Sequence, residues 1–321
     1  MTKIIEDLPN ELFLDIFQYF DGFQLYSSWF NLNQRFRKLV YSINMCVEID
    51  EFEIDSSFLL QHAKQCVYAR LINRNRVLKQ LDLTLFSNIR SLYLSLITTE
   101  QYDQIIPENF PLLTNLKINA IVASRNFAML LFGSKPFAHL KSCYLPYFHL
   151  TKEHLRSCLT VRSLCLEFCS AEIFFTQIKI YLPNLTSFET ISGTDITFIQ
   201  SIGQQQQQNL FHPHRNLRSI RIVLGKDTTF DYLPLILTVL PELRSLKLYC
   251  RAYCDYPQVA ELIQTKLIQL KYFDLTVNES RFQRLPNVEI LRRMSSWFSR
   301  VEIERSTGFN RIVCKTKKNS I

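Results

Sequence analysis

A six-residue apolar template recurs nine times between residues 89 and 303, and it restricts the fold more than any other feature of the chain. Apolar residues occupy positions 1, 4 and 6 of each copy, with polar or variable residues between them. The copies begin at residues 89, 113, 140, 161, 185, 217, 243, 270 and 298, and only LTSFET (185–190) lacks an apolar residue at position 6. Starts spaced 21 to 32 residues apart predict an array in which every unit supplies one short strand.

The segments between the copies have the apolar spacing of helices, as in AEIFFTQIKIYL (171–182) and YPQVAELIQTKLI (256–268). Proline often stands just before the strand, where it ends the helix and turns the chain; Pro111, Pro183 and Pro241 are examples. The longest interval contains QQQQQ (204–208), which we interpret as a flexible looped-out insertion that also exposes HPH (212–214).

This pattern resembles the leucine-rich repeat, in which each unit adds a strand and a helix to a solenoid. That family has Asn or Cys at position 9, and here only Cys169 and Asn278 fall there. The resemblance implies an irregular α/β solenoid with a parallel sheet over residues 46–305, followed by a basic C-terminal tail at 306–321. VEIDEFEI (47–54) is expected to form a strand before the first copy, and LKQLDL (78–83) to belong to an irregular first repeat. An ordinary α/β sheet is the alternative.

Residues 1–45 fall outside the period and predict three short helices. Pro9 suits a first helical turn, and an apolar stripe runs from Leu12 to Phe20 before Asp21-Gly22 ends the helix. Further short helices are expected around residues 25–30 and 32–43. So few residues cannot bury that many large side chains among themselves. The block therefore either caps the repeats or awaits a partner.

The same block resembles an F-box in the order of its motifs. Leu8-Pro9-Asn10-Glu11-Leu12 matches the first element of that family, residues 16–21 (IFQYFD) the second, and Arg35-Phe36 the last. Departures stand at Gln24, at Trp29-Phe30 and at residues 33–34 (NQ), and none places a charge in the apolar stripe.

The F-box resemblance implies a substrate-recognition subunit that performs no chemistry of its own. The three-helix block would dock to a Skp-type adaptor and through it to a cullin–RING ubiquitin ligase, while the repeats select an unknown substrate protein. The adaptor-binding residues that it implies are Leu8, Pro9, Leu12, Ile16, Phe17, Tyr19, Phe20, Leu25, Leu32 and Phe36. The alternative is a non-enzymatic repeat scaffold whose N-terminal helices only cap the solenoid.

Composition argues against most other function classes. The six glycines are scattered singly, and no P-loop, zinc-protease or serine-hydrolase motif is present, so no catalytic residue, metal or cofactor is expected. Cys158, Cys165 and Cys169 lie near His149 and His154, but without a C-x-x-C pair they are interpreted as reduced structural thiols.

The N-terminus lacks the pattern of a signal peptide, and no apolar run approaches the ~18 residues of a membrane span. We therefore expect a soluble intracellular protein, cytoplasmic and/or nuclear, with no membrane partner. Its nine cysteines, an odd number, fit a reducing compartment.

Charge is unevenly placed along the chain. Residues 1–45 carry a net −1 and the remainder +9. Six of the nine position-2 residues are basic, and we take them as candidate contacts for an acidic substrate segment, a solvated edge being the alternative: Arg90, Lys141, Arg162, Arg218, Arg244 and Lys271. Position 5 mixes both signs, from Lys117 to Glu302, which is a poor phosphate track and argues against nucleic acid.

Overall fold

The computed structural model describes residues 5–50, 56–72, 81–119, 131–133, 135–146, 156–167, 169, 178–191, 213–224, 233–250, 254–280, 287–305 and 309–317. The chain divides into two compact units. The first comprises Met1–Arg125 with Lys135–Ser142, and the second comprises Asn126–Ser134 with Cys143–Ile321. The glutamine run, His149 and His154 lie outside the described residues.

Short helices open the first unit. They are η1 (Ile5–Asp7), α1 (Asn10–Phe17), α2 (Gly22–Leu25), the π-helical turn η2 (Tyr26–Phe30) and α3 (Gln34–Ser42). Asp21 and Gln24 form a capping box at α2, and the Asn33 side chain accepts a hydrogen bond from the Phe36 N–H at the start of α3. These caps satisfy N–H groups that a helix leaves without internal partners, which explains why such short helices begin where they do.

Four parallel strands complete the first unit in sequence order: β1 (Met45–Asp50), β2 (Cys66–Ile72), β3 (Ser91–Ser95) and β4 (Asn115–Asn119). Between them lie α4 (Ser56–His62), η3 (Ala63–Gln65), η5 (Leu83–Leu85) and α5 (Thr99–Asp103). β2 is a repeat strand that the template missed, because Cys66 and Ala69 occupy its positions 1 and 4 in place of large aliphatic residues. The expected strand at 47–54 is confirmed over residues 47–50 as part of β1, which begins two residues earlier, and residues 51–54 lie outside the described residues.

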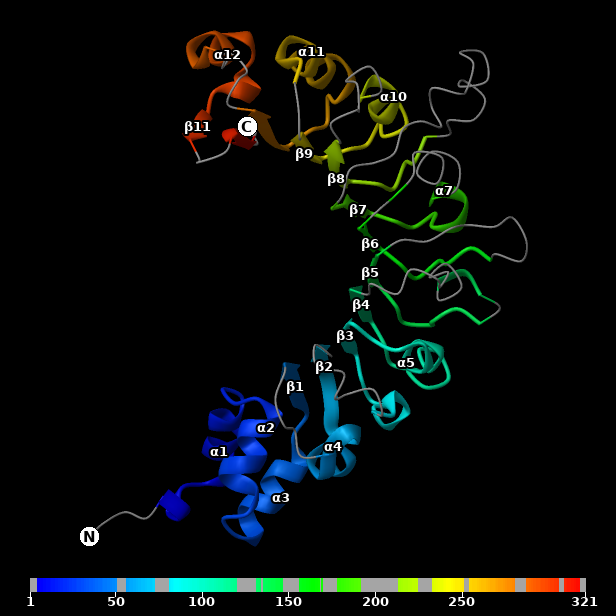
Figure 1. The fold of residues 1–321 in the computed structure, drawn as a ribbon, viewed down its shortest axis with the longest axis vertical. Coiled ribbons are helices and arrows are strands. Elements are labelled where there is room, and N and C mark those ends of the chain that lie inside the picture. Colours follow the sequence, from blue (N-terminus) through cyan, green and yellow to red (C-terminus); the bar gives the residue numbers. More distant parts are fainter. Residues whose placement is uncertain are drawn as a thin grey trace. The chain divides into compact units, whose positions relative to one another are not determined.

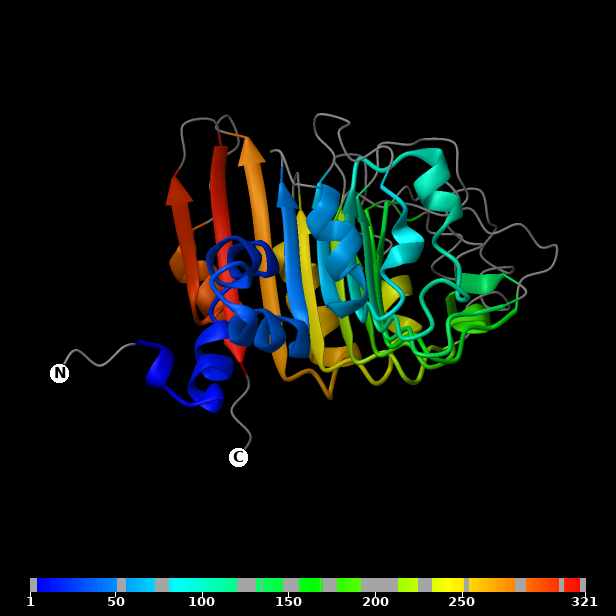
Figure 2. The ribbon, with the colours of Figure 1, turned by 90° about the horizontal axis from the view of Figure 1, so that it is seen from below.

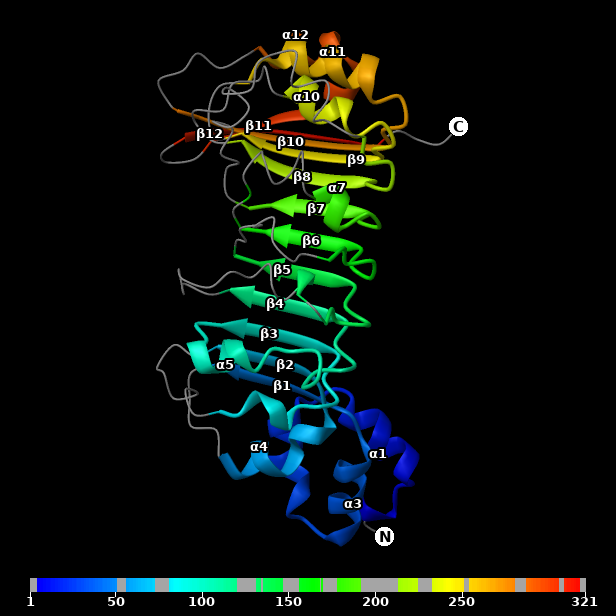
Figure 3. The same ribbon diagram turned by 90° about the vertical axis from the view of Figure 1, so that its right-hand side faces the viewer.

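Strand order also follows the sequence through most of the second unit (Figure 3). After β5 (Ser142–Leu145) at the unit boundary come β6 (Ser163–Leu166), β7 (Ser187–Thr190), β8 (Ser219–Leu224), β9 (Ser245–Cys250) and β10 (Tyr272–Ser280). The helices of this part are α7 (Ile178–Tyr181), α10 (Leu233–Thr238), α11 (Tyr256–Lys266), α12 (Val288–Met294) and η8 (Ser296–Phe298). In Figure 1, α10 and α11 lie on the same side of β8 and β9.

Template positions 1, 4 and 6 face the core. In β9, for example, Leu243, Leu246 and Leu248 are at most 1% exposed, and the equivalent residues of β8 and β10 are also buried. Parallel registry brings Ile220, Leu246 and Phe273 side by side. The mixed α/β fold with a mostly parallel sheet is therefore confirmed, and the apolar template is its internal layer.

The C-terminal end departs from the expected parallel array. Residues 309–317, which the sequence assigned to a tail, form β12 (Phe309–Lys317). This strand inserts between β10 and β11 (Val301–Arg305) and is antiparallel to both. The last template copy, β11, thus runs in the same direction as β10 but is an edge strand whose hydrogen-bonded neighbour, β12, is antiparallel to it. The physical reason is that three consecutive apolar residues of β12, Ile312, Val313 and Cys314, are buried in the sheet, whereas a solvated tail would leave them in water.

Candidate docking surfaces

An aromatic cluster holds the N-terminal helices together. Phe13 packs edge-on against Phe36 with ring centroids 4.8 Å apart, and Trp29 lies 5.3 Å from both Phe17 and Phe36. Arg35 ties α1 to α3, because its Nε donates to Asn10 Oδ1 at 2.8 Å, its Nη2 donates to the Leu8 carbonyl, and its guanidinium lies over the Phe13 ring.

The ten residues implied by the F-box resemblance therefore separate by exposure. Phe17, Leu25 and Phe36 are buried in this core and cannot contact a partner while the block is folded. Leu8, Ile16 and Phe20 are half-buried, whereas Pro9, Leu12, Tyr19 and Leu32 are exposed. The side chain of Tyr19 is 88% exposed, and those of Leu32 and Leu12 are 61% and 45% exposed. The folded block thus leaves an apolar surface that its own core does not use.

The departures from the F-box pattern also have structural roles. Trp29 is part of the aromatic cluster, Phe30 packs against Tyr26, and Gln24 completes the cap of α2. Trp29 Nε1 is buried and has no acceptor among the described residues. Comparison with the family pattern could identify these positions as departures but could not show that Trp29 and Phe30 pack inward.

The opposite face of the helical block packs on the first repeat. An ideal Cβ at Gly22 would lie 3.0 Å from Val47 Cγ2 and 3.3 Å from the Cys46 carbonyl oxygen, so α2 approaches β1 closely. His62 of α4 is fully buried among aromatic rings and stacks on Tyr41. Gln65 donates from Nε2 to the Tyr41 carbonyl at 2.6 Å. Residues 1–45 therefore complete their packing with side chains from 45–65, in addition to leaving an apolar surface.

The position-2 residues lie at the start of each strand, where the backbone forms a repeated bridge. The Arg218 carbonyl accepts from the N–H groups of both Arg244 and Ser245, at 2.8 and 2.9 Å. The same arrangement joins Arg90 to residues 114–115, Arg162 to 186–187 and Arg244 to 271–272.

Among the described residues, Arg162 and Arg218 are the position-2 basic residues whose side chains bind within the repeats. Arg218 Nη1 donates to Glu242 Oε2 at 2.6 Å and to the Glu242 carbonyl at 3.1 Å, and Arg162 Nη1 donates to the Asn184 carbonyl at 3.2 Å. Arg90, Lys141, Arg244 and Lys271 are exposed. The backbone hydrogen bonds at the strand starts align these basic residues along one edge of the sheet within each unit. Two of their guanidinium groups are used for contacts inside the repeats.

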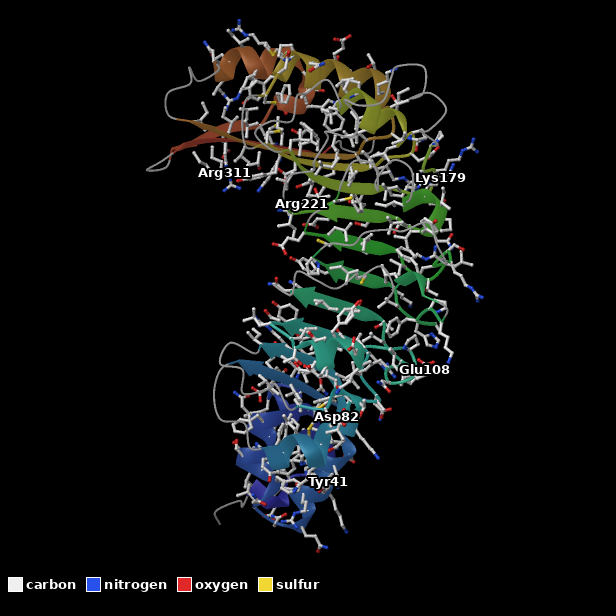
Figure 4. The ribbon with its side chains drawn as sticks, turned by 45° about the vertical axis from the view of Figure 1, so that its right-hand side comes forward. Tyr41, Asp82, Glu108, Lys179, Arg221 and Arg311 are labelled. Carbon is white, nitrogen blue, oxygen red and sulfur yellow. The ribbon has the colours of Figure 1, made fainter. Side chains whose placement is uncertain are left out.

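The position-5 residues line the open face of the sheet, and neighbours balance their charge. In the first unit, Arg70 pairs with Glu48 at 3.2 Å and lies over the Tyr93 ring, with Lys117 Nζ 4.9 Å from the same ring centroid. In the second, Arg221 pairs with Glu189 at 2.6 Å. Figure 4 shows Arg221 and Arg311 on the side of the sheet opposite Lys179 of α7. This face combines both signs of charge with aromatic rings, as the sequence predicted.

The nine cysteines form no disulfide, and most are buried. Burial raises the pKa of the Cys66 thiol to about 12 and that of Cys314 to about 11, so neither is a ready nucleophile or metal ligand. Among the described residues, no group of three or more His, Cys, Asp or Glu side chains is placed to hold a metal ion. No helix in the described part of the chain is long and apolar enough to cross a bilayer.

Comparison with known proteins does not supply a family. No family model matches the chain, and no curated protein matches it. Among solved structures, TLR13 in its complex with ssRNA13 is similar to the chain, with 14% identity and a TM-score of 0.35. The match covers 68% of this chain and 36% of the TLR13 chain, so the chain spans about a third of that structure. At this identity and TM-score the likeness carries no argument about function.

Proposed function

We propose that the chain is a substrate-recognition subunit of an SCF-type ubiquitin ligase, in which the N-terminal helices dock to a Skp-type adaptor and the repeats bind a target protein. The observation that carries this proposal is the exposure of three large apolar side chains, Leu12, Tyr19 and Leu32, on a block whose aromatic core is already filled. Such a subunit contributes proximity and orientation to a transfer that other subunits perform.

Two features of the helical block support the view that its exposed apolar residues bind a partner. Arg35 fixes α3 against the start of α1, so Leu12 on α1 is presented in a preorganised position. The exposed apolar residues also stand at positions of the F-box pattern, in LPNEL, in IFQYFD and in the segment leading to Arg35-Phe36.

A scaffold whose helices only cap the repeats is the competing proposal. It is favoured by the close approach of Gly22 to β1 and by the burial of His62, at the end of α4, against aromatic rings of the helical block. Capping explains the inner face of the block but gives no role to Leu12 or Leu32 on its outer surface.

The two proposals differ in what the full-length chain captures. A tagged chain expressed in cells should co-purify a Skp-type adaptor and a cullin, and the double substitution Leu12→Asp/Leu32→Asp should abolish both. Because both side chains are exposed, the variant should keep its fold. Ile268→Asp is a matched control, since Ile268 is 80% exposed but lies in the second unit. Capture that survives the double substitution, or that never occurs, would contradict the proposal.

Within this function, the exposed basic residues Arg90, Lys141, Arg244 and Lys271 are the proposed contacts for an acidic segment of the target. Arg162 and Arg218 are retained as weaker candidates because their guanidinium groups already bind within the repeats. Arg244→Glu/Lys271→Glu should remove co-purifying proteins other than the adaptor and the cullin, and an unchanged set of such proteins would exclude this role.

A further inference from the structure

β11 ends the sheet of the second unit, so one of its edges has no strand partner among the described residues (Figure 2). A strand in this position presents backbone N–H and C=O groups that can pair with another chain. On its inner edge, β11 pairs with β12 from Val301–Cys314 to Arg305–Asn310.

The side chains of β11 separate cleanly between its two faces. Val301 is 1% exposed and Ile303 is half-buried, whereas Glu302 and Glu304 between and beyond them are exposed. Since alternate residues of a strand share a face, the two carboxylates lie on the same open face. The edge strand therefore carries two acidic groups with no acidic or basic residue between them.

These carboxylates oppose pairing between two copies of the chain. Antiparallel pairing centred on Ile303 would place Glu302 of one copy opposite Glu304 of the other, and in-register parallel pairing would also oppose like charges. Like charges directly across a strand pair are destabilising. The sequence of β11 therefore protects the edge against self-association.

The carboxylates of Glu302 and Glu304 favour pairing with a strand that carries basic side chains. β12 already shows this chemistry on the inner edge, where Arg311 Nη1 lies 3.4 Å from Glu304 Oε2 across the register pair Glu304–Arg311. Lys315 continues the basic side chains on the same face of β12.

We propose that the outer edge of β11 binds an extended, basic segment of a partner protein by strand addition. Backbone pairing with β11 would supply affinity, and Lys or Arg at alternate positions of the incoming strand would face Glu302 and Glu304. Arg292, whose Nη2 donates to the Val301 carbonyl at 3.2 Å, limits the beginning of this edge and favours pairing from Glu302 onward. This surface shares no residue with the adaptor-docking helices or with the position-2 edge, so the inference does not depend on the proposed ligase function.

Binding of synthetic peptides to the full-length chain tests this inference. The probe is a seven-residue fluorescent peptide that alternates Lys and Val, and fluorescence polarisation measures its affinity. Three peptides serve as comparisons: one with Glu in place of Lys, one with the same composition but the lysines contiguous, and one N-methylated at alternate residues. The alternating basic peptide should bind most tightly, and N-methylation should abolish binding because it removes backbone donors.

Charge substitutions locate the site. Glu302→Lys should lower the affinity for the basic peptide roughly threefold to tenfold and raise the affinity for the acidic peptide, since it reverses one charge of the cross-strand pairs. This substitution leaves the Arg311–Glu304 pair in place. Glu261→Lys on α11 is a matched control because Glu261 is also exposed and lies in the same unit. Absence of binding, equal binding of the N-methylated peptide, or an unchanged affinity in Glu302→Lys would overturn the inference.

Discussion

At the scale of single residues, His214 shows how burial departs from a sequence-based expectation. The HPH stretch was expected to be exposed, but His214 is 6% exposed, and its Nε2 lies 3.3 Å from the Leu182 carbonyl oxygen. Its Nδ1 is buried without a partner among the described residues. Burial lowers the pKa of His214 below its usual value of 6.5, because the charged ring would lose solvation.

A defined pH dependence of stability follows from this lowered pKa. The unfolded chain binds a proton near pH 6.5, while folded His214 resists protonation until a lower pH. Its contribution to stability is therefore fully present above the unfolded-state pKa of about 6.5, and it is lost as the pH falls from there through the lower folded-state pKa. Urea unfolding between pH 5 and 8 should show the free energy of unfolding decreasing below about pH 6.5. In His214→Gln this decrease should be smaller, and an identical slope in both proteins would contradict the assignment.

Cys46 is the one exposed cysteine, and its reactivity gives a second residue-scale prediction. Partial burial and, secondarily, the Glu48 carboxylate raise the pKa of its thiol. Removing the carboxylate in Glu48→Gln should lower that pKa and increase the thiolate fraction. Labelling of native protein with a maleimide, followed by mass spectrometry, should find Cys46 modified first and modified faster in Glu48→Gln. Slower labelling in the variant would be inconsistent with this account.

At the scale of elements, α2 and β1 are joined by the close approach at Gly22. Gly→Ala within a helix normally stabilises by about 1 kcal/mol. Here the added methyl group would meet the Val47 side chain and the Cys46 carbonyl. We therefore expect Gly22→Ala to lower the free energy of unfolding, by roughly 1–3 kcal/mol, as overpacking does. Thermal or urea unfolding measures the sign, and an increase in stability would show that α2 is not held against β1.

Asparagines at the residue before template position 1 connect neighbouring repeats. Asn184 Nδ2 donates to the Leu159 carbonyl at 2.9 Å, Asn216 Nδ2 to the Pro183 carbonyl at 2.8 Å, and Asn88 Nδ2 to the Lys64 carbonyl at 2.7 Å. Asn184→Ala or Asn216→Ala should each destabilise by roughly 1 kcal/mol, the net value of one hydrogen bond. Gln269→Ala is the control, since Gln269 is exposed at the equivalent position. If all three variants lose the same free energy of unfolding, the asparagine hydrogen bonds do not stabilise the repeats.

These asparagines also show what sequence reading could and could not supply. The template identified the strands, because three buried positions per copy leave a periodic apolar signal. It did not identify the inter-repeat asparagines, since they stand at the opposite end of the strand from position 9 and recur in only some repeats. Position 9 itself falls mostly outside the described residues; Ile97 and Cys169 are buried there, and Asn278 is half-buried.

At the scale of the whole molecule, the sequence predicted the order of helical block and repeats but not the inward packing between them. The motif LPNEL and the stripe after it indicated an apolar surface, yet Phe17, Leu25 and Phe36 turn into the core while Leu12 and Leu32 turn out. Amphipathic spacing cannot distinguish these two faces when both are apolar. Nor could spacing show that β12 would enter the sheet, because antiparallel insertion depends on long-range pairing.

The most direct test of the proposed function is a titration of the purified full-length chain with a purified Skp-type adaptor by isothermal calorimetry. The account predicts a 1:1 complex with a negative heat-capacity change, as burial of the apolar surface at Leu12, Tyr19 and Leu32 requires. Leu12→Asp/Leu32→Asp should remove binding while Ile268→Asp preserves it. The absence of a complex with a chain whose circular dichroism and cooperative unfolding show it to be folded would contradict the proposal.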